Sequence, residues 1–274
     1  MKGKRYTVNR NVVIVRGGGD MGTGVAHKLH RSGFQVLILE MGKPLVIRRK
    51  VAFAQAVIDG RITVEGVKAV RVNAKKDIVA LWKQGKVPIV VDPQGNMIRE
   101  VKAEVVIDAT LAKRNTGMHR DMAPITIALG PGFRAGKDVD VVIETNRGHN
   151  LGRLIFKGYA EPNTGIPGPI KGYTEERVLR APCDGKIRTV LDIGGYVKKR
   201  DVICYCGKEP VRAEIDGVIR GLIMNTMEVK KGFKIGDIDP RGIREYCTTI
   251  SDKARAIGGA VLEAILYMKR VKKT

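Results

Sequence analysis

The stretch VVIVRGGGDMGTGVAHKL, residues 12–29, constrains the fold more than any other part of this sequence. Four apolar residues, typical of a buried strand, lead directly into three glycines and then into a segment with a helical apolar face. Gly17, Gly19 and Gly22 fit the pattern G-x-G-x-x-G, whose glycines permit a tight turn, close approach of a pyrophosphate, and close packing of helix on strand. The sequence therefore predicts a strand, a phosphate-binding turn and a helix whose N-terminus faces the phosphate.

The residues around this turn supply further cofactor-binding candidates. Asp20 and Thr23 lie in the turn itself, and Glu40 ends the next apolar run, where a carboxylate can accept hydrogen bonds from a ribose hydroxyl. The basic residues 48–50 follow that run, and they could accept a 2′-phosphate or simply begin a helix. A tight turn without a ligand is the alternative for the whole motif, because a fold does not fix a function.

Short apolar runs recur through the first half of the chain, as expected of strands covered on both faces in a parallel sheet. The runs are residues 12–15, 36–39, 87–91, 105–107, 125–129 and 139–143. With the helical segment after the first run they form a β-α-β unit. We expect an α/β protein with a Rossmann-like doubly wound parallel sheet.

Three of the later runs are followed by loops rich in polar residues and glycine: ATLAKRNTG, GPGFRAG and ETNRGHNLGR. Loops at the carboxyl ends of strands line the ligand crevice of an open sheet, so we expect all three to face the glycine turn. They add the cofactor-binding candidates Asn115, Thr116, Gly130, Gly132 and Arg147. Other anion-binding or hydrogen-bonding candidates are Lys113, Arg114, Glu144, Asn150 and Arg153, and the catalytic candidates are Asp108, Lys113 and His149. Solvated loop charges are the alternative.

Long segments of the chain resemble a known family. They are VVIVRGGGDMGTGVAHKLHRSGF, EMGKPLVIRRKVAFAQAV, VVIDATLAKRNTG, GPGFRAGKDVDVVIETNRGHNLGR and YAEPNTGIPGPIKGY, and they resemble the selenium-dependent molybdenum hydroxylase system protein family, the YqeB-type accessory proteins. The resemblance implies a cytoplasmic role in maturing a molybdenum hydroxylase, which would be the client partner. The chain is also similar by fold to the Rossmann part of the xanthine dehydrogenase accessory proteins, which implies a molybdopterin dinucleotide in place of NAD(P).

The glycine turn does not separate these cofactors, because both contain a pyrophosphate. Rival functions are an NAD(P)-dependent oxidoreductase and a nucleic-acid-binding module, so enzyme status stays open. The formal net charge of +22 would attract phosphates, nucleic acid or an acidic protein. One Trp and five Phe are few for a surface that stacks single-stranded bases, which argues against nucleic acid.

The second half contains an internal repeat. APCDGKIR at residues 181–188 recurs as AEIDGVIR at 213–220, and VKK at 197–199 recurs at 229–231. The repeat predicts a small duplicated β barrel and resembles biotinyl domains and other barrel-sandwich hybrids. Lys208 lies where a carrier domain presents its modified lysine but lacks flanking methionines, so we expect a docking or lid module.

These features predict four parts: a nucleotide-binding domain (1–160), a Pro/Gly-rich linker (161–176), a duplicated barrel (177–247) and a C-terminal helix packing back on the first domain (248–274). Cys183, Cys204 and Cys206 could hold a soft metal or selenium, but buried small side chains are favoured. His27 and His30 are expected on a polar helix face, so no metal site is predicted. No apolar run approaches the roughly 20 residues that span a bilayer, and we expect a cytoplasmic protein, with a homo-oligomer left open.

Overall fold

The computed structural model describes residues 9–272, which form two units. The α/β unit contains the described parts of Met1–Pro44, Phe53–Asn163 and Ile250–Thr274. The β unit contains Leu45–Ala52 and Thr164–Thr249. The chain therefore enters the β unit twice, and its last helix returns to the α/β unit.

Within residues 9–272, the α/β unit is built on a nine-stranded sheet of order β3-β4-β5-β2-β1-β6-β7-β8-β9. The strands are β1 (Asn9–Arg16), β2 (Gln35–Glu40), β3 (Arg61–Val64), β4 (Val67–Val72), β5 (Val87–Val91), β6 (Ala103–Asp108), β7 (Ile125–Leu129), β8 (Val141–Ile143) and β9 (Leu154–Ile155). The strands from β4 to β8 in this order are parallel to their neighbours, while β3 and β9 are antiparallel edges. Each of the six apolar runs expected to be strands overlaps one of these strands.

The fold class expected from the sequence, a Rossmann-like doubly wound parallel sheet followed by a barrel-sandwich-hybrid-like barrel, is wrong. The sheet is mixed, because β3 and β4 form a hairpin through Glu65 and Gly66, both with positive φ, and β9 folds back on β8. The links from β6 to β7 and from β7 to β8 contain no α-helix, since their polar, glycine-rich segments lack an apolar helical face. Two separate antiparallel sheets make up the β unit.

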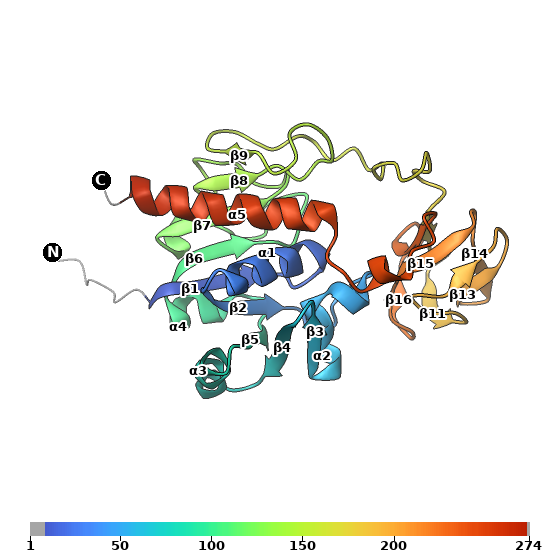
Figure 1. The fold of residues 1–274 in the computed structure, drawn as a ribbon, viewed down its shortest axis with the longest axis horizontal. Helices are drawn as coiled ribbons and strands as arrows, with labels where there is room; N and C mark the ends of the chain where they lie inside the picture. The colour runs from blue at the N-terminus through green and yellow to red at the C-terminus, as the bar shows by residue number, and fades with distance from the viewer. Residues whose placement is uncertain (1–8, 273–274) are drawn as a thin grey trace. The chain divides into compact units, whose positions relative to one another are not determined.

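Two long helices lie side by side on one face of the large sheet (Figure 1): α1 (Asp20–Arg31) and α5 (Asp252–Val271). Small residues permit this contact, because a Cβ on Gly24 would lie 2.6 Å from the carbonyl O of Ala254, and one on Gly258 would lie 2.7 Å from that of Gly24. Gly24 therefore faces the first turns of α5, and both helices begin at the carboxyl edge of the strands. The shorter helices are α2 (Ala56–Asp59), α3 (Lys75–Lys83) and α4 (Asn96–Val101), with 3-10 turns η2 (Phe53–Gln55) and η3 (Arg120–Met122).

The β unit contains two four-stranded sheets, β10-β17-β15-β12 and β14-β13-β11-β16. Its strands are β10 (Val178–Arg180), β11 (Gly185–Thr189), β12 (Tyr196–Val197), β13 (Val202–Cys206), β14 (Glu209–Arg212), β15 (Gly217–Leu222), β16 (Glu228–Val229) and β17 (Lys234–Asp239). The sequence repeat corresponds to two strand triplets, β11 to β13 and β15 to β17. The middle strand of each triplet pairs with the first strand of the other, so the copies interlock.

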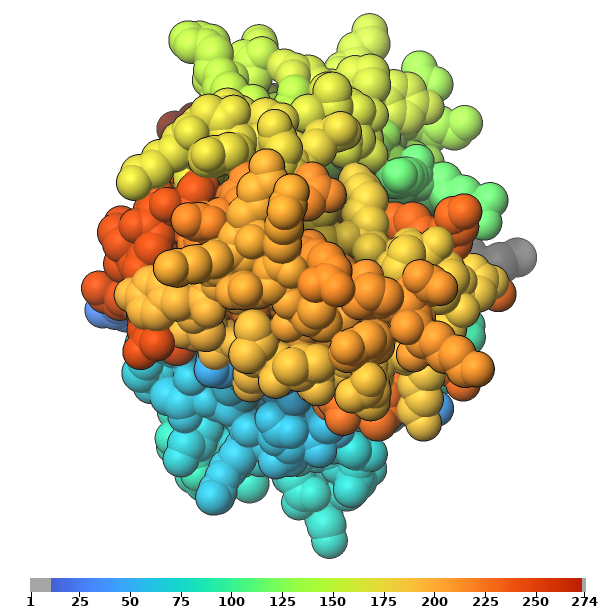
Figure 2. Space-filling view, turned by 90° about the vertical axis from the view of Figure 1, so that its right-hand side faces the viewer, coloured from blue at the N-terminus to red at the C-terminus, as the bar shows by residue number. Residues whose placement is uncertain are grey.

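The β unit has no α-helix over its sheets, only the 3-10 turns η1 (Arg49–Val51) and η4 (Arg244–Cys247). Its outward side chains form the surface directly, as the yellow to orange atoms of Figure 2 show. Inside, aliphatic residues and three cysteines form a single buried cluster. Across residues 9–272, no helix combines the length and the apolar character needed to cross a membrane.

Candidate functional site

The glycine turn after β1 has no room for side chains at two of its positions. A Cβ on Gly22 would lie 2.0 Å from the carbonyl O of Gly17, and one on Gly18 would lie 2.9 Å from the backbone N of Ala54. Gly17 has a φ of 91°, and its N–H donates to the carbonyl O of Leu39 at 2.8 Å. Gly19 is the N-cap of α1 and has no side chain with which to cap the helix. The turn is therefore tight, as predicted.

Glu40 and Thr23, both cofactor-binding candidates, hold this turn together. The Glu40 carboxylate accepts hydrogen bonds from the backbone N–H groups of Gly18, at 2.6 Å, and Met41, at 2.7 Å. Burial raises the pKa of Glu40, although these two hydrogen bonds act in the opposite direction. The fully buried Thr23 hydroxyl donates to the carbonyl O of Gly18 and accepts from the N–H of Phe53. Both side chains thus have a structural role that the sequence did not reveal.

The loops that follow β6, β7 and β8 contact one another at this edge of the sheet. A Cβ on Gly132 would lie 2.1 Å from the carbonyl O of Ala112, so the second loop packs directly on the first. A Cβ on Gly130 would lie 2.9 Å from the hydroxyl O of Thr145 in the third loop. Gly17 of the glycine turn contacts the loop after β6, because a Cβ on Gly17 would lie 3.3 Å from atoms of Thr110. The structure therefore brings the candidate glycines to one edge.

The side chains of Asp108 and Asn115 are held by hydrogen bonds to nearby residues of the protein. The fully buried Asp108 carboxylate forms an ion pair with Arg16 at 3.0 Å and accepts two hydrogen bonds from Thr110. Asn115 closes its own loop, accepting from the N–H groups of Gly117 and Met118 and donating back to the Met118 carbonyl. Both residues position the loop after β6. Lys113, Arg114, Thr116 and His149 are exposed at the same edge or beside it.

The loop after β8 is organised by two carboxylates. Glu144, only 2% exposed, accepts from the N–H groups of Asn146, at 2.6 Å, and Glu161, at 2.7 Å. The Glu161 carboxylate in turn accepts from the side-chain amides of Asn146, at 2.7 Å, and Asn150, at 2.8 Å. These amide hydrogen bonds lower the pKa of Glu161, so it is an anion at neutral pH. Arg147 forms a two-pronged ion pair with Asp252 at the start of α5.

Lys253 was not predicted from the sequence as a site residue. It lies within electrostatic range of Asp20 in the glycine turn and of Glu144 in this loop. It is partly buried, and no hydrogen bond or ion pair of its ammonium group is found within residues 9–272. Burial lowers its pKa and the nearby Arg147 charge lowers it further, against the opposing charges of Asp20, Glu144 and Asp252. A cation in the first turn of a helix is electrostatically unfavourable. A lysine in the first turn of a predicted helix, as in SDKARAI, is therefore the sequence signal that could have identified Lys253 as a site residue.

A hollow of about 370 Å³ opens beside Glu144. Its walls combine acids, cations and aromatic rings, which is the mixture of a site for a polar ligand. The lining residues are Glu144, Asn150, Arg153, Leu154, Ile155, Phe156, Lys157, Tyr159 and Glu161. Glu144 lines the hollow and also lies within electrostatic range of Lys253, so we treat the glycine turn, the lysine and the hollow as one candidate site in the α/β unit.

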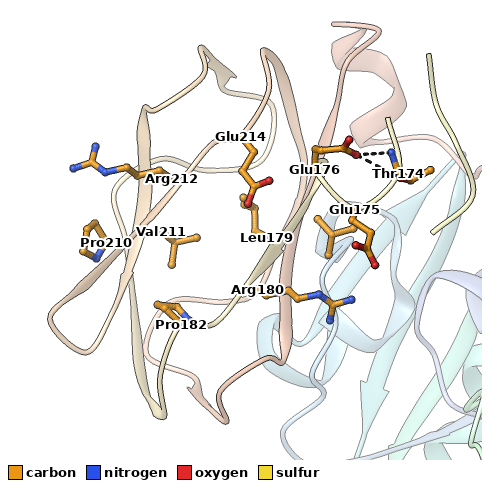
Figure 3. A pocket seen from close by; sticks show the side chains of 11 residues that line it. Thr174, Glu175, Glu176, Leu179, Arg180, Pro182, Pro210, Val211, Arg212 and Glu214 are labelled. Atoms are coloured by element: carbon orange, nitrogen blue, oxygen red, sulfur yellow. Dashed lines mark hydrogen bonds between the residues drawn. The ribbon is translucent and has the colours of Figure 1, made fainter. Parts of the chain in front are cut away.

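A second hollow, of about 560 Å³, lies in the β unit between the edge strands β10 and β14 (Figure 3). Its arginines point elsewhere, since Arg180 donates to the carbonyl O of Gly232 and Arg212 to that of Arg200. Glu176 accepts from the backbone N–H of Thr174. None of the site residues expected from the sequence lines it.

The basic residues 48–50 belong to the β unit. Arg48 donates to the carbonyl groups of Tyr246 and Thr249, Arg49 to that of Leu222, and Lys50 to that of Ile193. Their hydrogen bonds to backbone carbonyls give them a structural role within the β unit. The run also begins the short 3-10 turn η1, in line with the helix start that was the alternative to 2′-phosphate binding.

The cysteines and histidines lie in separate surroundings. Burial raises the pKa of Cys204 to about 12, so this thiol stays protonated, and the Cys183 and Cys206 thiols each donate to the other's carbonyl O at 3.2 Å. His27 is buried beside the carbonyl O of Glu65. Across the part of the chain that the structure describes, no group of three or more His, Cys, Asp or Glu residues could hold a metal ion.

Comparison with solved structures finds only weak similarity. The chain is 11% identical to an aspartoacylase family protein from Mesorhizobium loti, with a TM-score of 0.28 over 83% of this chain and 84% of that one. It is 10% identical to the ectoine utilization protein EutE from Ruegeria pomeroyi, with a TM-score of 0.23 over 83% of this chain and 57% of that one. TM-scores this low define neither the fold nor an activity of the chain.

Comparison of sequences gives a stronger result, although no protein-family model matches the chain. An uncharacterized protein, YqeB from Escherichia coli (strain K12), is 51% identical to it over 257 residues. The match covers 94% of this chain and 48% of the E. coli protein, so the chain spans about half the length of the curated relative it matches. Along nearly its whole length, this chain is thus similar to part of YqeB.

Proposed function

We propose that the α/β unit binds a dinucleotide, or the dinucleotide form of a molybdenum cofactor, and that the protein is an accessory factor in the maturation of a selenium-dependent molybdenum hydroxylase. The maturation role is supported by the resemblance to the YqeB-type accessory proteins. The binding role is supported by the geometry at the carboxyl edge of the large sheet.

The observation that carries the binding role is Lys253 beside the start of α1. Its ammonium is partly buried within electrostatic range of Arg147 as well as Asp20, Glu144 and Asp252, and it has no hydrogen-bond acceptor in the described chain. A phosphate placed there would accept hydrogen bonds from the lysine and from N–H groups at the N-terminus of α1, and Arg147 would add a second positive charge. The negative charge of the phosphate would also offset the free-energy cost of burying the charged form of Lys253.

The glycine turn fits the same ligand. Gly19, the N-cap of α1, has no side chain to block the approach of a pyrophosphate to the helix, and α1 and α5 both direct the positive ends of their dipoles to this edge. The net charge of +22 would raise the local concentration of a polyanionic cofactor and favour an acidic client protein.

Ligand binding is tested first on the full chain purified from cells that make molybdenum cofactor. Mass spectrometry of the released small molecules should identify a dinucleotide on the wild type and little on Gly19→Trp, whose indole would occupy the approach to the helix N-terminus. A wild-type chain that neither carries nor binds a dinucleotide under any condition contradicts the proposal.

The role of Lys253 is tested by calorimetric titration of the identified dinucleotide. Lys253→Met should weaken binding about 10- to 100-fold, because a charge-assisted hydrogen bond to phosphate is lost. Arg270→Met removes one charge from the opposite end of the same helix and should leave affinity unchanged. If the two variants bound the dinucleotide with equal affinity, Lys253 would not contribute to binding, and the proposed binding role would be contradicted.

The maturation role is tested by the activity of a molybdenum hydroxylase produced with the wild type, with Lys253→Met or with neither. Loss of hydroxylase activity with the variant, without any hydride transfer by the purified chain, is the expected result. Turnover of NAD(P) by the purified chain would instead favour the oxidoreductase.

A further inference from the structure

We propose that the hollow beside Glu161 holds a ring with two adjacent N–H donors, the 2-amino-4-oxo edge that pterin and guanine share. The inference deepens the proposed function, on which it rests, by selecting among the dinucleotides that the glycine turn alone does not distinguish. It is carried by a fixed carboxylate, by aromatic walls, and by their position relative to Lys253.

The Glu161 carboxylate is held as a pair of acceptors. Asn150 donates to one oxygen at 2.8 Å and Asn146 to the other at 2.7 Å, so the plane of the carboxylate is fixed from behind. Two oxygens offer about four lone-pair positions, and two remain for a ligand. A carboxylate with both oxygens available matches two parallel N–H donors, as it does with a guanidinium group.

Aromatic side chains line the same hollow. Both residues line the hollow and yet remain exposed to solvent: Tyr159 is 60% exposed and Phe156 is 44% exposed. Phe156 is steadied by Tyr267, with ring centroids 5.0 Å apart, and the Arg134 guanidinium lies 5.9 Å from the centre of the Tyr159 ring. Exposed aromatic faces in a pocket wall are platforms on which a planar heterocycle stacks.

The position of the hollow completes the argument. Glu144 lines it and also lies within electrostatic range of Lys253, as does Asp20 in the first turn of α1. A ligand with its pyrophosphate at Lys253 would therefore extend one ring toward Glu161. Arg153 and Lys157, on the same walls, are available for the phosphate next to that ring.

This chemistry discriminates between the candidate cofactors. Adenine and nicotinamide, the rings of NAD(P), lack two adjacent ring-edge N–H donors, so they would pair with at most one Glu161 oxygen and leave the other to water. A site with a fixed polar partner rejects analogues that cannot satisfy it. The pterin of a molybdopterin dinucleotide offers both donors.

The test uses the full chain and calorimetric titration with GDP, IDP and ADP. IDP lacks only the 2-amino group of GDP, and ADP lacks both donors. We expect GDP to bind about 10-fold more tightly than IDP and about 100-fold more tightly than ADP. Glu161→Gln should lower the GDP affinity about 10- to 100-fold and leave ADP unchanged. Glu263→Gln, an exposed position on α5, is the matched control and should bind all three as the wild type does.

A second variant guards against misfolding of the first. Tyr159→Ala removes an exposed ring, and it should weaken GDP and ADP by the same factor because stacking does not depend on the donors. Guanosine and free 6-hydroxymethylpterin, which carry no phosphate, identify the source of the ring. Binding of either that depends on Glu161 supports the inference, and the tighter of the two names the source.

The outcomes separate this inference from the proposed function. Equal affinity for GDP and ADP, with both lost in Lys253→Met, overturns the ring site and leaves the phosphate site standing. If guanosine binding depends on Glu161 and a diphosphate adds no affinity, the ring site stands and the phosphate site is overturned. Equal effects of Glu161→Gln and Glu263→Gln on GDP, or no binding of any probe up to about 1 mM, overturn the inference.

Discussion

Gly22 shows how a single missing side chain sets the geometry of the candidate site. A Cβ there would lie 2.0 Å from the Gly17 carbonyl O, and no rotamer change can relieve this clash because the backbone fixes the position of a Cβ and the oxygen is itself a backbone atom. Alanine at this position must therefore open the turn between β1 and α1.

We expect Gly22→Ala to lower the free energy of unfolding by about 2–4 kcal/mol, measured by urea denaturation. Gly42→Ala is the control, because its Cβ would make only an ordinary 3.6 Å contact with Val91. Its stability should stay within about 0.5 kcal/mol of the wild type. A Gly22→Ala chain as stable as the control would show that the turn does not need this glycine.

At single residues, the sequence predicted backbone requirements better than side-chain roles. The glycine spacing correctly indicated a tight turn, because only glycine fits such close backbone approaches. Thr23, Glu40 and Asn115 have the polarity of ligand-binding residues, but their hydrogen bonds are taken by the protein itself. Which acceptors a fold consumes depends on tertiary contacts, and no spacing rule reports them. Lys253 was missed although its place in the first turn of the C-terminal helix could have identified it.

Among the elements, the pair α1 and α5 depends on small residues at its interface. A Cβ on Gly258 would lie 2.7 Å from the Gly24 carbonyl O, whereas one on its neighbour Gly259 would meet nothing within 4 Å. Two adjacent glycines in one helix therefore have opposite environments, which provides a matched pair of substitutions.

Gly258→Ala should lower the free energy of unfolding by about 1–3 kcal/mol, because the two helices must move apart. Gly259→Ala should raise it by about 0.5–1 kcal/mol, since alanine favours a helix and has room there. Thermal or urea unfolding of both variants measures the difference. Substitutions with the same sign would contradict the close packing of α1 on α5.

The buried strands of the large sheet were predictable from the sequence, but its edge strands and the arrangement of the sheet were not. Apolar runs locate buried strands wherever both faces are covered, as in β1, β2 and β6. The hairpin of β3 and β4 was missed because its strands are short and half exposed, with few consecutive apolar residues. The antiparallel direction of the edge strand β3 makes this side of the sheet mixed, and it depends on the Glu65–Gly66 turn, whose two residues both have positive φ.

At the scale of the whole molecule, buried acids make both units sensitive to pH. In the β unit, burial alone would raise the pKa of Asp239, but hydrogen bonds from Arg241 and the charge of Arg220 outweigh it and lower the pKa. In the α/β unit, Asp140 has a lowered pKa because hydrogen bonds from Thr126, Lys272 and Arg120 outweigh its burial. Such carboxylates stabilise the fold only while they are ionised.

The sign of the effect follows from these lowered pKa values. Above the ordinary aspartate pKa of about 4, the full contribution is present, and it is lost as the pH falls through the lower pKa of the folded state. We therefore expect the free energy of unfolding to decrease steeply below about pH 4, beyond the loss that general charge repulsion in so basic a chain produces.

Asp239→Asn separates the specific effect from the general one. The variant should be about 1–3 kcal/mol less stable than the wild type at pH 7, because Arg241 loses its ion pair with Asp239 and Arg220 keeps only its ion pair with Asp237, and the gap should narrow as the pH falls below about 4. Asp121→Asn, at an exposed position, removes the same charge and should show a small gap that does not change with pH. Urea unfolding at pH 7, 5, 4 and 3 measures both. A gap for Asp239→Asn that persists undiminished at pH 3 would mean that ionisation of this carboxylate does not support the fold, and that its arginine neighbours are held by other contacts.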